Sequence, residues 1–254
     1  MRAPTDTIAA PLFPRNLPWV NAPAGGQVSI IQRDRPLLVE FWDFCRPNSM
    51  RTLPYVKAWH ERYAADGLRV VGVHCPGFEP SRDEQGVRDA VARLQIAHPV
   101  LIDSELELWQ EYENEGWPAR YLFDGRARLF EFHYGEGDYA GTELAIQRLL
   151  GVEREPLEPV RLQDAPDAVL ARQSEDRPGA HQGPYEAGGV WAVLSGGGEL
   201  SFTAADGASG LVEVSHAGAY ELVDHTRHTA GELTLSCGAG VVCHATCFAP
   251  GLAS

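Results

Sequence analysis

The hydrophobic pattern is strongest at residues 37–42, an apolar run that is interrupted only by Glu40 and ends in Phe41 and Trp42. Such a run is typical of a strand buried on both faces of a parallel sheet. The residues after it have a helical pattern, whose apolar face contains Leu53, Val56, Trp59 and Tyr63. The sequence therefore predicts a strand that leads into a helix, with Cys45 in the turn. In open α/β sheets ligands bind at such junctions, because the helix N–H groups point toward them.

Strand and helix patterns continue to alternate as far as about residue 151. The segments predict, in order, a strand at 68–74, a capped amphipathic helix at 81–94, a short helix at 106–112, strands at 121–123 and 129–133, and a closing helix at 142–150. A strand, a helix and a second strand in succession indicate parallel pairing. The turn Asp124-Gly125 between the two later strands indicates an antiparallel hairpin.

The pattern changes in the C-terminal part of the chain. Residues 152–183 are rich in charged residues and proline, and we interpret them as a linker between a first domain at 1–151, which includes a Pro- and Ala-rich arm at 1–25, and a second domain at 184–254. Short strands separated by glycine turns follow, at 190–194, 199–203, 211–214, 219–223, 232–237 and 241–248. They predict a small all-β domain, similar to a sandwich or jelly roll.

The stretch 37–59 resembles the thioredoxin-like superfamily, in the redoxin branch where a strand ending in Phe-Trp precedes a CxxC motif and a helix with Arg-Thr-Leu-Pro-Tyr. Further segments also match: LRVVGVHC at 68–75, HPVLID at 98–103, GWPARYLFD at 116–124 and YGEGD at 134–138. The resemblance to the thioredoxin domains of DipZ-type and NHL-repeat proteins covers roughly residues 10–151. It implies a thioredoxin-like α/β domain in which Trp117 and Pro118 form the cis-proline loop.

The active-site motif departs from the family pattern. Aligning Trp42 and Arg51 with TrpxxxCxxCxArg places Arg46 and Ser49 where the family has its two redox cysteines. Cys45 falls one residue before that motif, so the usual dithiol is missing. The family resemblance still implies that the peptide-binding surface lies here. We therefore take Trp42, Arg46, Asn48, Ser49, Trp117 and Pro118 as candidate substrate-binding residues.

Two interpretations of Cys45 remain open. A helix N-terminus and the neighbouring Arg46 both lower the pKa of a thiol, which predicts a reactive thiolate. Alternatively, Cys45 is a packed residue of a redox-silent domain, because thiol exchange normally needs a second cysteine. Cys75 follows the neighbouring strand, and parallel strands end at one edge of a sheet. Cys45 and Cys75 are thus the candidate catalytic pair, if their Cα atoms come within the ~4.4 to 6.8 Å that a disulfide requires.

Two polar residues near the junction have alternative roles. Ser49 replaces a redox cysteine with a hydroxyl, which at this helix position is more typical of a cap than of a nucleophile. Glu40 lies on the buried strand, close to where related redoxins place an acidic group beneath their cysteines. It either tunes a thiol or relays a proton there, or occupies a partly exposed edge position.

Composition limits the classes of partner. The chain has 254 residues, 44% of them hydrophobic, and a net charge of −14. Nucleic acids and anionic membranes are bound by clustered Lys and Arg, so both are disfavoured. No segment resembles a signal peptide or a membrane span, which predicts a cytoplasmic protein. Five cysteines, an odd number, argue against a disulfide framework.

The tail contains cysteines and histidines that suggest a zinc site at first sight. Cys243 and Cys247 are four residues apart, or about 13 Å along a strand, whereas Zn–S bonds are about 2.3 Å. Alternation instead predicts that the three tail cysteines, Cys237, Cys243 and Cys247, share a core face. We predict no metal and no cofactor. His216, His225 and His228 are either solvated or collect a ligand.

Two function classes follow. One is an atypical thiol oxidoreductase that uses Cys45 on protein or small-molecule thiols. The other is a thioredoxin-like module that binds peptides or proteins without redox turnover. Neither the substrate nor the oligomeric state follows from the sequence.

Overall fold

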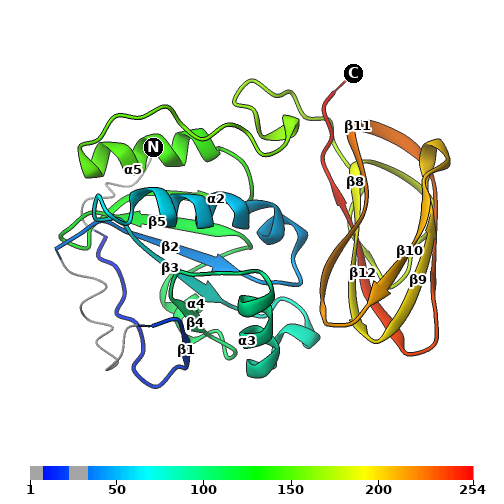
Figure 1. Cartoon of the computed structure of the whole chain (residues 1–254), viewed down its shortest axis with the longest axis horizontal. Coiled ribbons are helices and arrows are strands. Elements are labelled where there is room, and N and C mark those ends of the chain that lie inside the picture. Colours follow the sequence, from blue (N-terminus) through cyan, green and yellow to red (C-terminus); the bar gives the residue numbers. More distant parts are fainter. Residues whose placement is uncertain (1–7, 23–33, 254) are drawn as a thin grey trace. The chain divides into compact units, whose positions relative to one another are not determined.

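The computed structural model describes residues 8–22 and 34–253 of the chain (Figure 1). Contacts divide the chain into two compact units. The first contains residues 1–43, 51–77 and 82–158, and the second contains residues 44–50, 78–81 and 159–254. The predicted N-terminal arm lies only partly within the described residues.

A six-stranded mixed sheet forms the core of the thioredoxin-like part, with the strand order β1-β4-β3-β2-β5-β6. Its strands are β1 (Trp19–Val20), β2 (Leu37–Trp42), β3 (Arg69–His74), β4 (Val100–Ile102), β5 (Ala119–Phe123) and β6 (Leu129–Tyr134). β2, β3 and β4 are parallel to one another, and the other three strands pair antiparallel with their neighbours. The predicted strand at 37–42 is therefore a central strand of this sheet.

Both faces of this sheet are covered, as Figure 1 shows. Helices α2 (Pro47–Tyr63) and α5 (Tyr139–Leu150) pack on the face that contains Leu38. The short helix α4 (Glu107–Glu111) and Phe13 of the arm pack on the face that contains Phe41. Since alternate residues of a strand point to opposite faces, the largely apolar strand β2 supplies two cores at once.

One buried carboxylate connects α2 to α5. Glu143 of α5 accepts hydrogen bonds from the Trp59 indole at 3.2 Å and the Tyr63 hydroxyl at 2.6 Å, both on α2. It also accepts the backbone N–H of Leu157 at 2.8 Å and pairs with Arg62 at 3.3 Å. A buried carboxylate is stable only when all of its hydrogen-bond and ion-pair partners are in place. Glu143 therefore fixes the packing of the two helices.

The predicted elements of this domain are present, with shifted ends. Helix α3 (Glu84–Arg93) begins after Asp83, whose carboxylate accepts the Gly86 N–H at 2.7 Å as an N-cap. Strands β5 and β6 form the expected hairpin. The Asp124 carboxylate accepts two backbone N–H groups of its turn. The predicted thioredoxin-like α/β fold is confirmed.

The C-terminal part is a separate, wholly antiparallel sheet of six strands in the order β10-β9-β11-β8-β12-β7. They are β7 (Arg177–Pro178), β8 (Gln182–Gly196), β9 (Gly198–Thr203), β10 (Ser209–Val214), β11 (Gly218–Cys237) and β12 (Val241–Ala249). Short 3₁₀ helices lie at Glu79–Ser81, Leu162–Asp164 and Ala205–Gly207. The all-β prediction for the tail is confirmed.

One strand of the tail differs from its prediction. The two strands expected at 219–223 and 232–237 are parts of the single long strand β11. Its register with β8 shifts between Asp224 and Thr229, and pairing resumes beyond. The polar residues that resemble a loop in the sequence are an irregularity within the strand, because β8 offers a partner on both sides of it.

Within the described residues, no helix is both long enough and apolar enough to cross a membrane.

Candidate thiol and peptide-binding site

The junction has the predicted local structure. β2 ends at Trp42 and α2 begins at Pro47, so Cys45 lies in the turn. Its side chain is fully buried. The Arg46 guanidinium lies over the ring of Phe78, 4.6 Å from its centroid. A thiol reacts with an external disulfide only when its sulfur is accessible, so this geometry opposes a nucleophilic role for Cys45.

Cys75 is fully buried at the end of β3, and its thiol donates to the Asp103 carboxylate at 3.5 Å. Burial raises the pKa of Cys75 well above its usual value, and the charge of Asp103 raises it further. The same carboxylate accepts the backbone N–H groups of Glu107 and Trp109 at the start of α4. This arrangement favours a protonated, structural cysteine over the predicted catalytic one.

All five cysteines are free thiols in the structure, so Cys45 and Cys75 form no disulfide there.

The loop at Trp117 and Pro118 approaches the end of β3. The peptide bond between these two residues is cis. The Trp117 indole N–H donates to the Cys75 carbonyl at 2.9 Å, and its ring packs against Trp109 with centroids 4.2 Å apart. The Pro118 carbonyl accepts the Gly135 N–H at 2.8 Å. Of the predicted site residues, the structure thus connects Trp117 to Cys75, whereas Pro118 bonds to Gly135.

The other predicted binding residues differ in accessibility. Asn48 is exposed at the start of α2, whereas Ser49 and Trp42 are buried. Because a buried hydroxyl cannot contact a ligand at the surface, Ser49 is a poor candidate for binding. Arg51, the last residue of the family motif, is also buried, and its Nε donates to Glu136 at 2.8 Å. Only part of the predicted set is therefore available to a ligand.

A buried polar pair beside the junction was not foreseen. Asp43 directly follows β2, and its Oδ2 accepts the Gly77 N–H at 2.7 Å. Its Oδ1 lies 3.6 Å from Nε2 of His74, and both side chains are fully buried. Trp42 and His74 are opposite each other in the parallel register of β2 and β3. Polar residues at the ends of two adjacent predicted strands are the signal that could have found this pair.

Glu40 lies in the interior of the sheet, so the alternative of a partly exposed edge position is wrong. Desolvation raises the pKa of Glu40 to about 8, while Arg120 lowers it. These two residues are opposite each other on β2 and β5. Neither carboxylate oxygen of Glu40 has a hydrogen-bond partner among the described residues. A carboxyl in this environment is predominantly protonated at neutral pH.

The tail cysteines do not share one face. A register shift between Cys243 and Ala245 makes His244 the extra residue of a β-bulge, and its ring nitrogen Nε2 lies 2.7 Å from the Ser195 hydroxyl. Cys243 is opposite Leu194, whereas Cys247 is opposite Trp191. The bulge reverses the alternation, so Cys247 points to the other face. Burial raises the pKa values of both Cys243, to about 11, and Cys247.

The tail histidines each contact a separate partner. His225 lies 2.7 Å from the Tyr185 hydroxyl, and the His216 ring stacks on Tyr220. His228 is 3.8 Å from a carboxylate oxygen of Glu186. In the described part of the chain, no group of three or more His, Cys, Asp or Glu side chains could hold a metal ion. The three histidines do not converge on a common ligand site.

Comparison with known proteins supports the thioredoxin-like assignment, although no protein-family model matches the chain. The protein DipZ of Mycobacterium bovis is 33% identical over 133 residues, which cover 52% of this chain and 19% of DipZ. Thiol-disulfide oxidoreductase YkuV of Bacillus subtilis is 31% identical over 134 residues, which cover 52% of this chain and 87% of YkuV. The solution structure of a thioredoxin-like protein in the oxidized form is 27% identical with a TM-score of 0.51. That match covers 57% of this chain and 97% of the solved one.

Proposed function

We propose, from the premise that the chain belongs to the thioredoxin-like family of thiol-disulfide oxidoreductases, that its thioredoxin-like domain is a redox-silent member that binds extended segments of a partner protein. Binding would take place at the loop of Trp117 and Pro118. The alternative, an atypical oxidoreductase that uses Cys45, has less support.

The state of the two candidate sulfurs carries this proposal. Both are fully buried, and the Cys75 thiol donates a hydrogen bond to the Asp103 carboxylate. Thiol exchange requires an accessible thiolate to attack and a second thiol to release the mixed disulfide. Arg46 and Ser49 occupy the two positions where the family resemblance places these thiols. On this resemblance, the two thiols that the chemistry of the family requires are replaced, while the surrounding fold is kept.

The loop itself supports a role in binding. Trp117 is half-buried, packed against Trp109 and hydrogen bonded to Cys75, so its exposed part has a fixed position. A fixed aromatic surface loses little conformational entropy when a ligand binds, which favours affinity. The ligand we propose is a peptide or protein segment in the cytoplasm. The net charge of −14 argues against nucleic acid or an anionic membrane surface.

Brief alkylation with a substoichiometric reagent, followed by mass-spectrometric mapping, tests redox silence. The half-buried Cys237 and Cys243 should be labelled before Cys45, because exposure and thiolate fraction set the order of reaction. Two results together would overturn the proposal in favour of the oxidoreductase. Cys45 would be labelled early, and the chain would reduce insulin disulfides with an activity that Cys45→Ser abolishes.

Binding is tested with carboxymethylated insulin B chain, an extended peptide whose thiols are blocked. Titration should change the tryptophan fluorescence, and the same change should persist in Cys45→Ala. Trp117→Ala should weaken binding about tenfold, in the range of a lost aromatic contact. If the peptide does not bind at millimolar concentration, or binds Trp117→Ala equally well, the loop is not the binding surface.

A further inference from the structure

Strand β6 is an edge strand of the thioredoxin-like sheet, and no described residue pairs with the outer edge of its residues 130–134. It is the last strand in the order, and it pairs along its length with β5. Gly135 donates to the Pro118 carbonyl at 2.8 Å, and Ala119 is opposite Tyr134. Antiparallel pairs alternate between hydrogen-bonded and non-bonded positions. The N–H and C=O groups of Phe132 and Tyr134 therefore point away from β5, toward the outer edge.

The same edge already accepts a strand from this chain. Leu129 donates its N–H to the Ile8 carbonyl at 2.9 Å, and Ala10 donates to Ala127 at 2.9 Å. Ala9 forms an antiparallel bridge with Arg128. These bonds lie at the beginning of β6. The outer edge is thus geometrically able to add a strand, and its continuation along residues 130–134 pairs with no residue in the part of the chain that the structure describes.

One side of this edge is aromatic. Phe132 is 38% exposed and Tyr134 is 41% exposed. Their positions are fixed from below by Tyr121, whose hydroxyl is 3.0 Å from that of Tyr134 and whose ring stacks on Phe132. Two aromatic side chains on alternate residues of an edge strand form the type of surface that apolar side chains of an added strand would cover.

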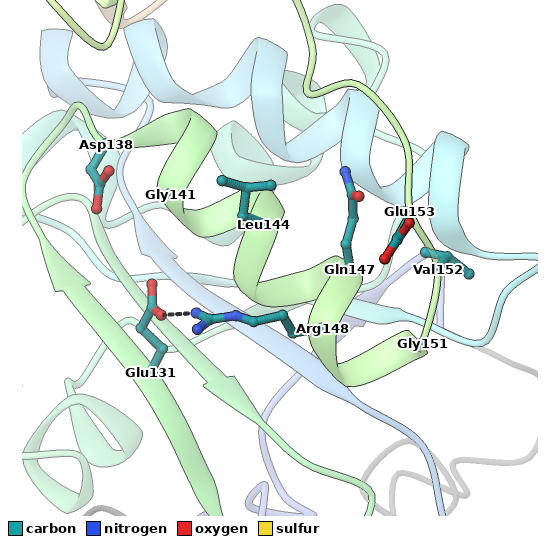
Figure 2. Close-up of a pocket in the computed structure, with 9 residues that line it drawn as sticks. All are labelled: Glu131, Asp138, Gly141, Leu144, Gln147, Arg148, Gly151, Val152 and Glu153. Carbon is teal, nitrogen blue, oxygen red and sulfur yellow. Dashed lines mark hydrogen bonds and ion pairs between the residues drawn. The ribbon is translucent and has the colours of Figure 1, made fainter.

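The other side of the edge faces an acidic groove of about 1040 Å³, shown in Figure 2. Its lining combines the exposed apolar side chain of Leu144 with three carboxylates, from Glu131, Asp138 and Glu153. Arg148 is the single basic residue of the lining, and it pairs with Glu131 at 3.4 Å. The side chain of Arg148 is 64% exposed, so this ion pair is weak and can exchange partners.

We infer that the outer edge of β6 is a docking site for an extended segment of a partner protein, which adds as a strand and alternates apolar with basic residues. Alternate side chains of an added strand point to opposite faces. One set would cover Phe132 and Tyr134, and the other would meet the carboxylates of the groove. A second copy of the chain fits less well, because it would bring the same acidic groove and a net charge of −14.

The test uses a peptide of alternating lysine and valine, about seven residues long, which matches the length of an ordinary strand. A peptide of the same composition, with its lysines and valines in two blocks, is the control. Binding of the alternating peptide should slow hydrogen exchange at the Phe132 and Tyr134 amides, and it should weaken with salt. The block peptide should give neither protection nor comparable affinity.

Charge-reversed variants distinguish peptide binding at the groove from non-specific attraction of a basic peptide to an acidic protein. Glu131→Lys should weaken binding about tenfold, since it replaces an attraction with a repulsion at an interface. Glu105→Lys, at an exposed position before α4, changes the net charge equally and should leave affinity within about twofold. Phe132→Thr keeps a strand-forming residue but removes the aromatic contact, and should also weaken binding.

Several results would overturn this inference. Equal losses in Glu131→Lys and Glu105→Lys would indicate attraction to the whole acidic chain. If the peptide protects the Trp117 amide from hydrogen exchange but not the Phe132 and Tyr134 amides, binding would be assigned to the cis-proline loop instead. Protection that rises with protein concentration, without peptide, would indicate pairing between copies. Failure to bind at millimolar peptide would exclude the site.

Discussion

Glu40 makes the stability of the thioredoxin-like domain depend on pH in an unusual direction. Its carboxyl is fully buried in the central strand, and its pKa is raised from 4.5 to about 8, chiefly by desolvation. Between these two values the folded state holds a proton that the unfolded state has released. The unfolded state is therefore favoured progressively as the pH rises from 4.5 to 8.

The magnitude follows from the two pKa values of Glu40. Each unit of difference corresponds to about 1.4 kcal/mol. Between pH 5 and pH 8, the contribution of Glu40 to the free energy of unfolding should fall by about 3 to 4 kcal/mol. Glu40→Gln has nearly the same shape but does not ionise. It should be more stable than the unmodified chain at pH 8, and the difference should shrink by this amount at pH 5.

The measurement is urea unfolding followed by tryptophan fluorescence at a series of pH values. Five of the six tryptophans lie between residues 19 and 117, so the signal reports mainly on the thioredoxin-like domain. Glu105→Gln, at an exposed position, is the matched control and should follow the unmodified chain at every pH. If Glu40→Gln has the same pH dependence as the unmodified chain, Glu40 is not protonated in the fold and the reasoning fails.

Three further predictions use other parts of the same domain. Glu143→Ala removes the shared acceptor of α2 and α5, and should lower the free energy of unfolding by about 3 to 5 kcal/mol in the same assay, with Glu143→Gln losing less. Burial lowers the pKa of His98 to about 3, so the unfolded state gains a proton below pH 6.5. Between pH 8 and pH 5 the contribution of His98 to the free energy of unfolding should fall by about 2 kcal/mol, so acidification should favour His98→Phe over the unmodified chain by that amount in the same assay. The double variant Arg46→Cys and Ser49→Cys places cysteines at the two positions where the family resemblance expects the dithiol. It should acquire insulin reduction in a turbidity assay, and continued inactivity would show that the scaffold no longer supports exchange.

The sequence was sufficient for features that depend on local pattern. The apolar run at 37–42, the turn that contains Cys45 and the hairpin around Asp124 were all predicted, because strand length, helix start and turn residues are encoded within a few positions. The resemblance, rather than any propensity, located the loop at Trp117 and Pro118.

Features that depend on distant segments could not be predicted in this way. Burial of Glu40 depends on β5 lying beside β2, and the Asp43–His74 contact depends on the register of β2 with β3. The pattern of alternation also failed at His244, where the bulge becomes visible only through pairing with β8. The state of Cys75 depends on Asp103, which is 28 residues away.

The bulge at His244 has a consequence for what strand β12 tolerates. The residues after His244 pair regularly with β8, so Phe248 packs into the core of the tail and Cys247 points away from it. Deleting His244 would remove the extra residue of the bulge and leave these pairs unchanged, so every following side chain would keep its face. A substitution at the same position would leave that pattern in place. His244 is therefore the position at which this strand can lose one residue without turning Phe248 out of the core.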